Sequence, residues 1–343
     1  MDTTTTNTVR IGVIGVGRIG RMHAALVARQ VPGASLSVVT DALEDAARGV
    51  ADDLGVPVAA DVDELLAADD VDAVAICSST DTHADLIVAA ARAGKAIFCE
   101  KPVSLDLAEV DRALAAVEEA GVPFQIGFNR RFDPSHAAVA AAVADGTIGV
   151  PQLVRISSRD PAPPPLGYVR VSGGIFLDMT IHDFDMARFV TRREVEEVFA
   201  AGEVLVDPDV GDAGDVDTAV VMLRHEDGCL TTIDNSRQAV YGYDQRVEVF
   251  GSAGMAASEN PLANTTIVRT ETGTHAATLP YFYLDRYIPS YLREWEAFVA
   301  AVSSGRTPPV TTKDARAPLA IGLAAWRSLR EGRPVAVEEI EAG

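Results

Sequence analysis

Short apolar runs alternate with amphipathic segments over the first 126 residues of the chain. The first run, Val9 to Ile14, has the continuous apolar character of a buried parallel strand. Thr82 is the expected N-cap of a helix over residues 83–93. Further strands are expected at residues 34–40, 71–76, 96–99 and 122–126, and further helices at residues 62–67 and 107–120. Because strands that alternate with helices form a parallel sheet with right-handed crossovers, we predict a doubly wound α/β domain.

Beyond residue 126 the pattern changes to strand-like stretches on either side of one helical segment. Asp227-Gly228 is a hairpin signal between two of these strands. Helical patterns return at residues 287–303 and 313–329, the second of which can pack back against the first domain. The strands are expected at residues 153–157, 195–205, 217–225, 228–236, 245–251 and 265–270. We therefore predict an α+β domain with a largely antiparallel open sheet, one face of which is available for self-association.

The first strand leads into Gly15-Val-Gly17-Arg18-Ile19-Gly20, and a helical pattern follows. This is G-x-G-x-x-G in the context that dinucleotide binding requires, after a strand and at the start of a helix. The first glycine permits a tight turn, the second lets the backbone approach a pyrophosphate, and the third lets helix and strand pack closely. The helix N-terminus adds N–H groups for the phosphates. We therefore predict a dinucleotide-binding Rossmann domain over residues 1–126 and a substrate-binding and oligomerisation domain over residues 127–343.

Asp41 ends the second predicted strand, 21 residues after Gly20 (41 − 20). An acidic residue near this spacing accepts hydrogen bonds from the adenosine ribose hydroxyls and repels a 2′-phosphate, which favours NAD over NADP. The other interpretation is that Asp41 is the N-cap of a helix that starts at Ala42. The two roles can coexist.

Polar residues also follow other strands of this domain, at the edge of a parallel sheet where ligands bind. Lys101 follows a buried strand and precedes Pro102, which restricts the lysine backbone to extended geometry. A lysine held there can point into the cofactor crevice, whereas the alternative is an ordinary solvated loop lysine. The further candidates for cofactor contacts at or near these strand ends are Ser78, Ser79, Thr80, His83 and Glu100.

The segment from Ser172 to Val190 carries the main candidate chemistry of the second half. A glycine pair opens it, and apolar residues follow at helical spacing. Asp178 and His182 are four residues apart, so on a continuous helix they lie one above the other on one face. A carboxylate and an imidazole in this arrangement can bind a polar substrate and accept its proton. The alternative is an amphipathic helix with an ordinary Asp/His pair.

These motifs together resemble those of the Gfo/Idh/MocA oxidoreductases, and within them the inositol 2-dehydrogenase branch. The resemblance spans nearly the whole chain. The matching pieces are Gly15–Gly20 with His23, Glu100-Lys101-Pro102, Gly127–Asp133, Ser158–Pro161 and Gly173–Asp185. The resemblance implies an NAD-dependent dehydrogenase that oxidises a ring carbinol to a ketone, with myo-inositol converted to 2-keto-myo-inositol (scyllo-inosose) in inositol catabolism. It also implies a homotetramer.

The resemblance further implies a catalytic triad of Lys101, Asp178 and His182. A histidine titrates near neutrality, so His182 is the natural general base for the hydroxyl proton. Lys101 can stabilise negative charge on the same oxygen, and Asp178 can orient Lys101 or bind a neighbouring hydroxyl. Asn129 and Arg130 follow the last strand of the first domain and are expected to reach the substrate. Further substrate-binding candidates, each with a surface or packing position as the alternative, are Arg159, Asp160, Tyr241 and Tyr287.

Two other functions are compatible with the same residues. A member of such a family can act on another cyclic polyol or sugar, such as scyllo-inositol, D-chiro-inositol or a pyranose. A cofactor-bound sensor or binding protein can keep the fold without turnover. Loss of Lys101 or His182 would indicate such a protein, and the presence of both favours an enzyme.

Composition limits the partners and the compartment. The 343 residues carry a formal charge of −21, which argues against nucleic acid and anionic membranes as partners but says little about a neutral polyol. Met1 to Thr8 has neither a basic region nor an apolar h-region, and the chain has no run of eighteen apolar residues. Cys77, Cys99 and Cys229 form no C-x-x-C pair, so we predict no metal site and a location in the reducing cytoplasm.

Overall fold

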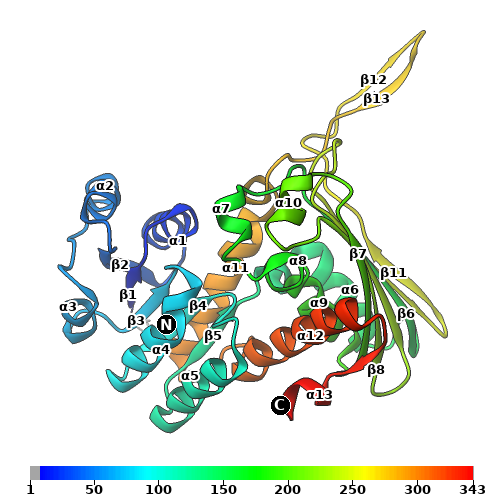
Figure 1. The fold of residues 1–343 in the computed structure, drawn as a ribbon. Helices are drawn as coiled ribbons and strands as arrows, with labels where there is room; N and C mark the ends of the chain where they lie inside the picture. Colours follow the sequence, from blue (N-terminus) through cyan, green and yellow to red (C-terminus); the bar gives the residue numbers. More distant parts are fainter. Residues whose placement is uncertain (1–7, 343) are drawn as a thin grey trace. The chain divides into compact units, whose positions relative to one another are not determined.

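Five parallel strands form the sheet that the apolar runs near the N-terminus predict (Figure 1). The computed structural model describes residues 8–342 of the chain. The strands lie in the order β2-β1-β3-β4-β5, and each neighbouring pair is parallel. They are β1 (Val9–Ile14), β2 (Ala34–Thr40), β3 (Ala73–Ile76), β4 (Ala96–Glu100) and β5 (Phe124–Gly127). The strand order reverses between β1 and β3, and doubly wound sheets bind their ligands beyond the strand ends at such a point.

The helices that connect these strands lie close to the predicted positions, with one correction. They are α1 (Arg18–Arg29), α2 (Glu44–Leu54), α3 (Val62–Ala67), α4 (Thr80–Arg92) and α5 (Leu107–Ala120). Helix α4 begins at Thr80 after Ser79, so the prediction that Thr82 is its N-cap is wrong. The Thr82 hydroxyl lies inside the first turn and donates to the carbonyl oxygen of Ser79 at 2.8 Å. Several consecutive hydroxyl residues are suitable caps, and the sequence pattern alone does not choose among them.

The second sheet has seven strands in the order β11-β10-β6-β9-β8-β7-β14. Its neighbouring strands are antiparallel apart from the parallel pair β6 and β9, which confirms the predicted largely antiparallel sheet. At the predicted hairpin of Asp227 and Gly228, the N–H of His225 donates to the carbonyl oxygen of Cys229 at 2.9 Å. The strands are β6 (Pro151–Arg159), β7 (Val195–Glu203), β8 (Thr218–His225), β9 (Leu230–Ser236), β10 (Asp244–Gly251), β11 (Gly254–Ser258) and β14 (Val335–Ala336).

One face of this sheet is buried under helices, and the other is exposed. On the buried face Val221 and Leu223 of β8 share a core cluster with Phe176, Phe184 and Ile321 from helices. Each such side chain stabilises the fold by about 1.5–3 kcal/mol when it is fully buried. The helices of this part are η1 (Asn129–Phe132), α6 (Pro134–Ala144), α7 (Leu166–Val169), α8 (Gly174–Asp178), α9 (Ile181–Thr191), α10 (Pro208–Asp212) and α13 (Glu338–Glu341).

The exposed face carries large apolar side chains. Strand register places Leu153 opposite Phe250, and Val220 and Met222 lie two strands away on the same face. These four side chains are between 39% and 56% exposed. A further hairpin of β12 (Ile267–Thr270) and β13 (Gly273–Ala276) projects from this part of the chain with all of its strand residues exposed (Figure 1).

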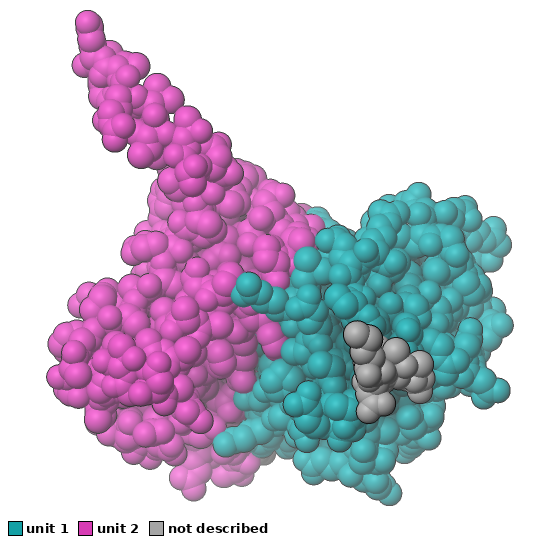
Figure 2. Space-filling view, turned by 180° about the vertical axis from the view of Figure 1, so that it is seen from behind, with its two compact units in different colours: residues 1–129, 291–316 teal, residues 130–290, 317–343 magenta. Residues whose placement is uncertain are grey.

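The chain divides into two compact units, residues 1–129 with 291–316 and residues 130–290 with 317–343 (Figure 2). This differs from the predicted continuous domains of residues 1–126 and 127–343, because α11 (Tyr283–Ser304) and α12 (Thr312–Glu331) each contribute to both units. In unit 1 the indole ring of Trp295 stacks on Phe98 with ring centroids 4.4 Å apart. In unit 2 Gly322 lies against Leu177, where a Cβ would come within 2.5 Å of a side-chain carbon. It is therefore α11, rather than the last long helix, that returns to the dinucleotide unit over most of its length.

Two structural findings on the described residues concern membrane spans and metal ions. Among the helices of residues 8–342, none has both the length and the apolar character that a membrane span requires. Within the same residues, no cluster of three or more His, Cys, Asp and Glu side chains has an arrangement suited to a metal ion.

Candidate active site

Each glycine of the Gly15–Gly20 loop meets a different structural requirement. Gly15 has a φ of +86°, and a Cβ there would lie 2.6 Å from the Ser78 backbone. At Gly20 a Cβ would lie 1.9 Å from the carbonyl oxygen of Gly15. At Gly17, by contrast, a Cβ would meet no atom of residues 8–342 within 4 Å. Gly15 and Gly20 are therefore required by the fold, whereas Gly17 leaves open space of the kind that a pyrophosphate needs. Arg18 beside it is exposed and Ile19 is half-buried.

Asp41 directly follows β2 and holds this loop. Its Oδ2 accepts the backbone N–H of Val16 at 2.7 Å, and its Oδ1 accepts that of Leu43 at 2.8 Å. Helix α2 begins at Glu44 after Leu43, so the N-cap role proposed for Asp41 does not occur. An ionised carboxylate has about four lone-pair sites, which leaves acceptor capacity for ribose hydroxyls.

His83 connects two of the predicted cofactor loops. Its Nδ1 lies 2.8 Å from the carbonyl oxygen of Pro102, and its Nε2 lies 3.1 Å from that of Ser78. Burial lowers the pKa of His83, against the opposing effect of the two carbonyl groups. His83 therefore acts here as a brace between the loops after β3 and β4, inside the unit. Ser79 and Thr80 stand at the start of α4, beside this brace.

Glu100 belongs to a second buried brace, which sequence analysis did not identify. The indole N–H of Trp295 donates to Nδ1 of His23 at 2.8 Å, so the proton of His23 is assigned to Nε2. Nε2 in turn donates to Oε1 of Glu100 at 2.8 Å. The other carboxylate oxygen accepts the backbone N–H of Lys101 at 3.3 Å. This chain of contacts joins α11, α1 and the end of β4, and it fixes the backbone from which the Lys101 side chain extends.

In unit 2, the segment with Asp178 and His182 is not the single helix that the spacing predicts. Asp178 is the last residue of α8 and His182 lies in the first turn of α9. The N–H of His182 donates to Met179 rather than to Asp178. At the break, the single proton of the Thr180 hydroxyl faces Oδ1 of Asn235 at 2.7 Å and the carbonyl oxygen of Ile175 at 3.1 Å. A hydroxyl that bonds back to a helix carbonyl slightly destabilises a helix and often bends it. Asp178 and His182 are both half-buried.

Asp178 is held by two side chains that sequence analysis missed. The Tyr168 hydroxyl donates to its Oδ1 at 2.8 Å, and Nη1 of Arg237 donates to its Oδ2 at 3.1 Å. Neither residue belongs to a motif, and they come from distant parts of the chain. Asp160 lies 3.9 Å from Nη1 of the same arginine. Burial raises the pKa of Asp160 to about 6; Arg237 opposes this rise and Asp178 adds to it.

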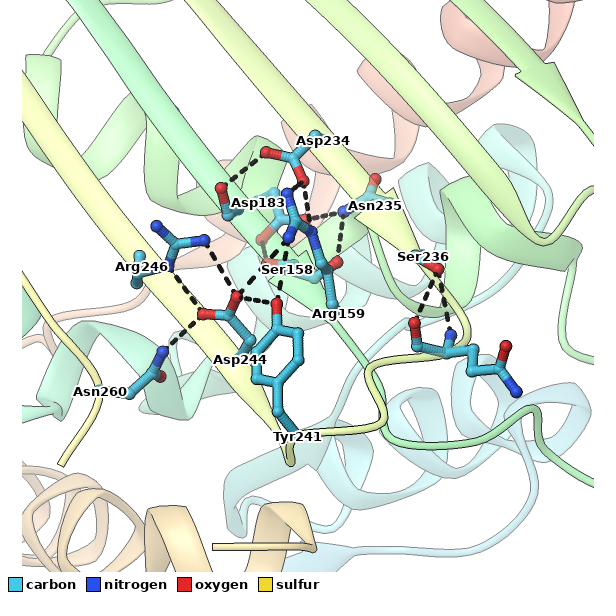
Figure 3. A network of polar contacts seen from close by, with 12 residues as sticks. Ser158, Arg159, Asp183, Asp234, Asn235, Ser236, Tyr241, Asp244, Arg246 and Asn260 are labelled. Carbon is cyan, nitrogen blue, oxygen red and sulfur yellow. Dashed lines mark hydrogen bonds and ion pairs between the residues drawn. The ribbon is translucent and has the colours of Figure 1, made fainter. Parts of the chain in front are cut away.

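Arg130 and Tyr287 take part in an interior network rather than facing open space. Arg130 donates to Oδ1 of Asp183 at 2.8 Å and lies 5.9 Å from the ring centroid of Tyr287. Oδ2 of Asp183 accepts from Asn235 at 2.8 Å (Figure 3). Burial raises the pKa of Asp183, although Arg130 and the hydrogen bonds of Ser158 and Asn235 oppose the rise. Asn129 is buried at the start of η1 in the other unit, directly before Arg130.

Arg159 and Tyr241 lie on the exposed face of the second sheet. Arg159 donates to Oδ1 of Asp234 at 2.7 Å and to the Tyr241 hydroxyl at 3.1 Å (Figure 3). Consecutive strand residues point to opposite faces, so Ser158 meets Asp183 while Arg159 points the other way. The structure therefore does not bring Arg159 and Tyr241 to Asp178. They line a groove of about 340 Å³ together with Thr218, Ala219, Val220, Asp234, Asn235, Ser236 and Gln238.

The parallel sheet, the glycine loop and Asp41 define a dinucleotide-binding unit, which is joined to an α+β unit. Residues 9–128 match the model of the oxidoreductase family with an NAD-binding Rossmann fold, and residues 136–257 match the GFO/IDH/MocA C-terminal domain. The chain belongs to the Gfo/Idh/MocA oxidoreductase family. These matches confirm the resemblance, the fold class and NAD as the cofactor.

Curated relatives and solved structures are similar over nearly the whole chain. The myo-inositol 2-dehydrogenase of Thermotoga maritima is 53% identical over 97% of this chain and 99% of its own length. The inositol 2-dehydrogenase of Rhizobium meliloti is 47% identical over 96% and 99%. A crystal structure of scyllo-inositol dehydrogenase from Lactobacillus casei with bound NAD(H) and scyllo-inositol superposes with a TM-score of 0.90 at 31% identity, over 96% of this chain and 99% of that one.

Substitution of Gly17 and Gly20 separates cofactor binding from folding. Gly20→Ala forces a Cβ onto the Gly15 carbonyl oxygen, and we expect it to destabilise unit 1 by about 3 kcal/mol or more. Gly17→Ala has room in the fold, so we expect stability to change by less than about 1 kcal/mol while NAD affinity falls about tenfold or more. Thermal unfolding and fluorescence titration with NADH measure the two effects. Equal NAD affinity in wild type and Gly17→Ala would contradict the assignment.

The raised pKa of Asp160 predicts a pH-dependent term in stability. The pKa of Asp160 is about 6 in the folded state and has its ordinary value of 3.8 in the unfolded state. Between these two pH values the folded state binds more protons than the unfolded state. The stability of the folded state therefore falls as pH rises from 3.8 to about 6. Stability of wild type relative to Asp160→Asn should therefore decrease by up to about 3 kcal/mol from pH 4 to pH 7, measured by urea unfolding. In exposed Asp145, bonds from Thr147 lower the pKa from its ordinary value of 3.8, so the stability of wild type relative to Asp145→Asn should rise with pH, mainly below about pH 4. Parallel profiles for wild type and Asp160→Asn would count against this prediction.

Proposed function

We propose that this protein is an NAD-dependent inositol 2-dehydrogenase that oxidises myo-inositol to 2-keto-myo-inositol (scyllo-inosose). The observation that carries the proposal is the full-length identity of 53% to a myo-inositol 2-dehydrogenase. Unit 2 supplies a carboxylate and an imidazole, Asp178 and His182, within one helix–break–helix segment. Unit 1 supplies Lys101 directly after β4, which β3 separates from β1, the strand that leads into the glycine loop.

In this proposal the residues of the chain divide the work of one oxidation. NAD, when bound, accepts the hydride from the carbinol carbon. His182 removes the hydroxyl proton, because a neutral imidazole is a suitable base near neutral pH. Lys101 stabilises the negative charge that develops on the same oxygen. Asp178 binds a neighbouring hydroxyl or orients Lys101, and Asn129, Arg130, Asp160 and Tyr287 support the substrate.

The cofactor contacts follow from the loops of unit 1. Gly15, Gly17 and Gly20 with Arg18 and Ile19 accommodate the pyrophosphate at the start of α1. Asp41 accepts the ribose hydroxyls, and its charge repels a 2′-phosphate, so NAD is preferred to NADP. Ser78, Ser79 and Thr80 line the neighbouring strand end, with His83 and Glu100 behind them as braces.

A second candidate substrate is scyllo-inositol. The observation in its favour is the similarity to the solved scyllo-inositol dehydrogenase, although that identity is 31% rather than 53%. Initial rates over a panel of myo-, scyllo- and D-chiro-inositol and pyranose sugars, each with NAD and NADP, test both candidates and the cofactor preference. Turnover that is fastest with a pyranose sugar would overturn the proposed substrate. Equal turnover with NAD and NADP would overturn the proposed cofactor preference.

Replacement of His182 and Lys101 tests the division of roles. His182→Ala should lower turnover of myo-inositol by about a hundredfold or more through loss of the base, and NAD binding should persist. Lys101→Ala should give a loss of similar size, and Lys101→Arg should not restore activity because a planar guanidinium does not replace a compact ammonium.

The matched control for these substitutions is His275→Ala, which changes an exposed histidine on β13 and should keep full activity. Steady-state rates with NADH titration measure all four variants. A His182→Ala variant with intact fold and NAD binding that turns over myo-inositol near the wild-type rate would contradict the assignment.

We further propose that the enzyme is a cytoplasmic homotetramer that works in inositol catabolism. The three cysteines are buried free thiols, which suits a reducing compartment. The exposed sheet face carries the apolar side chains of Leu153, Val220, Met222 and Phe250, and exposed apolar side chains that gather on one face favour association between copies.

Light scattering at micromolar concentration tests the assembly. Wild type should have the mass of four chains, and Val220→Asp/Met222→Lys should reduce that mass because it places charges on the exposed face. The control Leu205→Asp changes an even more exposed apolar side chain in the loop after β7 and should leave the mass unchanged. A monomeric wild type would rule out the proposed tetramer.

A further inference from the structure

Arg237 directly follows β9 and is almost completely buried, at 1% exposure of its side chain. Its backbone N–H donates to the carbonyl oxygen of Asp217 at 2.8 Å, which anchors the residue to the sheet. Its side chain points toward three carboxylates. Nη1 donates to Asp178 at 3.1 Å, Nη2 lies 3.7 Å from Asp215, and Nη1 lies 3.9 Å from Asp160.

The hydrogen bonding of this guanidinium is directed to Asp178. Within residues 8–342, no acceptor lies at hydrogen-bond distance from Nε or Nη2 of Arg237. The bond from Nη1 to Asp178 is thus its main directional contact, and the other two carboxylates contribute charge. A single cation facing three carboxylates is not a simple ion pair, because one partner would suffice to neutralise it.

Asp178 and Asp215 lie at opposite ends of α8. Oδ1 of Asp215 accepts the N–H of Ile175 at 2.9 Å, in the first turn of the helix. Gly174 has a φ of +75°, and a Cβ there would lie 2.7 Å from the Asp215 carboxylate. Asp178 is the last residue of the helix. A helix of five residues is not stable by itself, so α8 depends on contacts such as these at its two ends.

We propose that Arg237 is a positioning residue that fixes α8 between Asp215 and Asp178 and so sets the orientation of the Asp178 carboxylate toward the polyol. The inference rests on the proposed function, because it takes Asp178 to bind a substrate hydroxyl. Tyr168 holds the other carboxylate oxygen of Asp178 from the loop side. With both oxygens anchored, the carboxylate presents its remaining lone pairs in one direction.

A double-mutant cycle tests whether Arg237 acts through Asp178. Arg237→Met should lower kcat/KM for myo-inositol about a hundredfold, since a displacement of about 1 Å at a substrate-binding group has effects of this size. Asp178→Asn should give a loss of similar size, and the double variant should be no worse than Asp178→Asn alone. Losses that multiply in the double variant would overturn the proposal.

Conservative and matched variants separate positioning from stability. Arg237→Lys keeps the charge but reaches one carboxylate at a time, so kcat/KM should remain at least about tenfold below wild type. Arg188→Met removes another buried arginine, paired with Glu194 at 2.7 Å at the far end of α9, and should change kcat/KM less than threefold. If Arg237→Met does not fold, the double variant Arg237→Met/Asp215→Asn takes its place in the assays. It also neutralises Asp215, one of the carboxylates that Arg237→Met leaves without a cation. Full activity of Arg237→Lys, or an equal loss in Arg188→Met, would overturn the proposal.

Hydrogen exchange provides a readout that does not depend on the substrate. Amides of residues 174–180 should exchange at least tenfold faster in Arg237→Met than in wild type, and at the wild-type rate in Arg188→Met. Unchanged exchange in Arg237→Met would overturn the positioning role even if activity falls. If wild type turns over no inositol, the proposed function fails and the link to the polyol fails with it, whereas faster exchange would still establish the support of α8.

Discussion

A charge or polar group that is buried must find a partner, and this constraint shapes both units. In unit 1 the buried carboxylate of Glu100 is paired with His23, which accepts in turn from Trp295. In unit 2 Arg130 pairs with Asp183 and Arg237 with Asp178. An unpaired ionised group in such an interior is strongly unfavourable, so each of these contacts fixes the elements that carry its two partners.

The same pairs place the groups to which we assign chemistry. Glu100 holds the backbone of Lys101 and also the helix that starts at the glycine loop, so the lysine and the phosphate-binding turn belong to one rigid arrangement. Arg237 and Tyr168 hold Asp178 in a similar way. Preorganised groups need no rearrangement when charge develops on a substrate, and that is where electrostatic stabilisation is most effective.

Strand periodicity explains why some predicted site residues lie in the interior of unit 2 and others lie on the exposed face of its sheet. Ser158 and Arg159 are neighbours in the sequence, yet Ser158 contacts the buried Asp183 and Arg159 contacts Asp234 on the exposed face. Which of two adjacent polar residues points inward depends on the register of β6 with β9 and β10. The spacing of residues along the chain does not reveal this register. Sequence alone therefore could not show that the positions of Arg159 and Tyr241 differ from that of Asp160.

The sequence by itself determined the parallel sheet, the glycine loop, Asp41 and the segment with Asp178 and His182. These features depend on local patterns of the sequence, namely apolar runs of strand length, glycines at fixed spacing and a short motif. Only the tertiary structure decided that the central helix is broken between Asp178 and Ile181, and that Trp295, Tyr168 and Arg237 hold Glu100, Asp178 and their surroundings in place. Their partners lie between 10 and 272 positions away along the chain, and contacts across such separations arise from packing rather than from any local pattern.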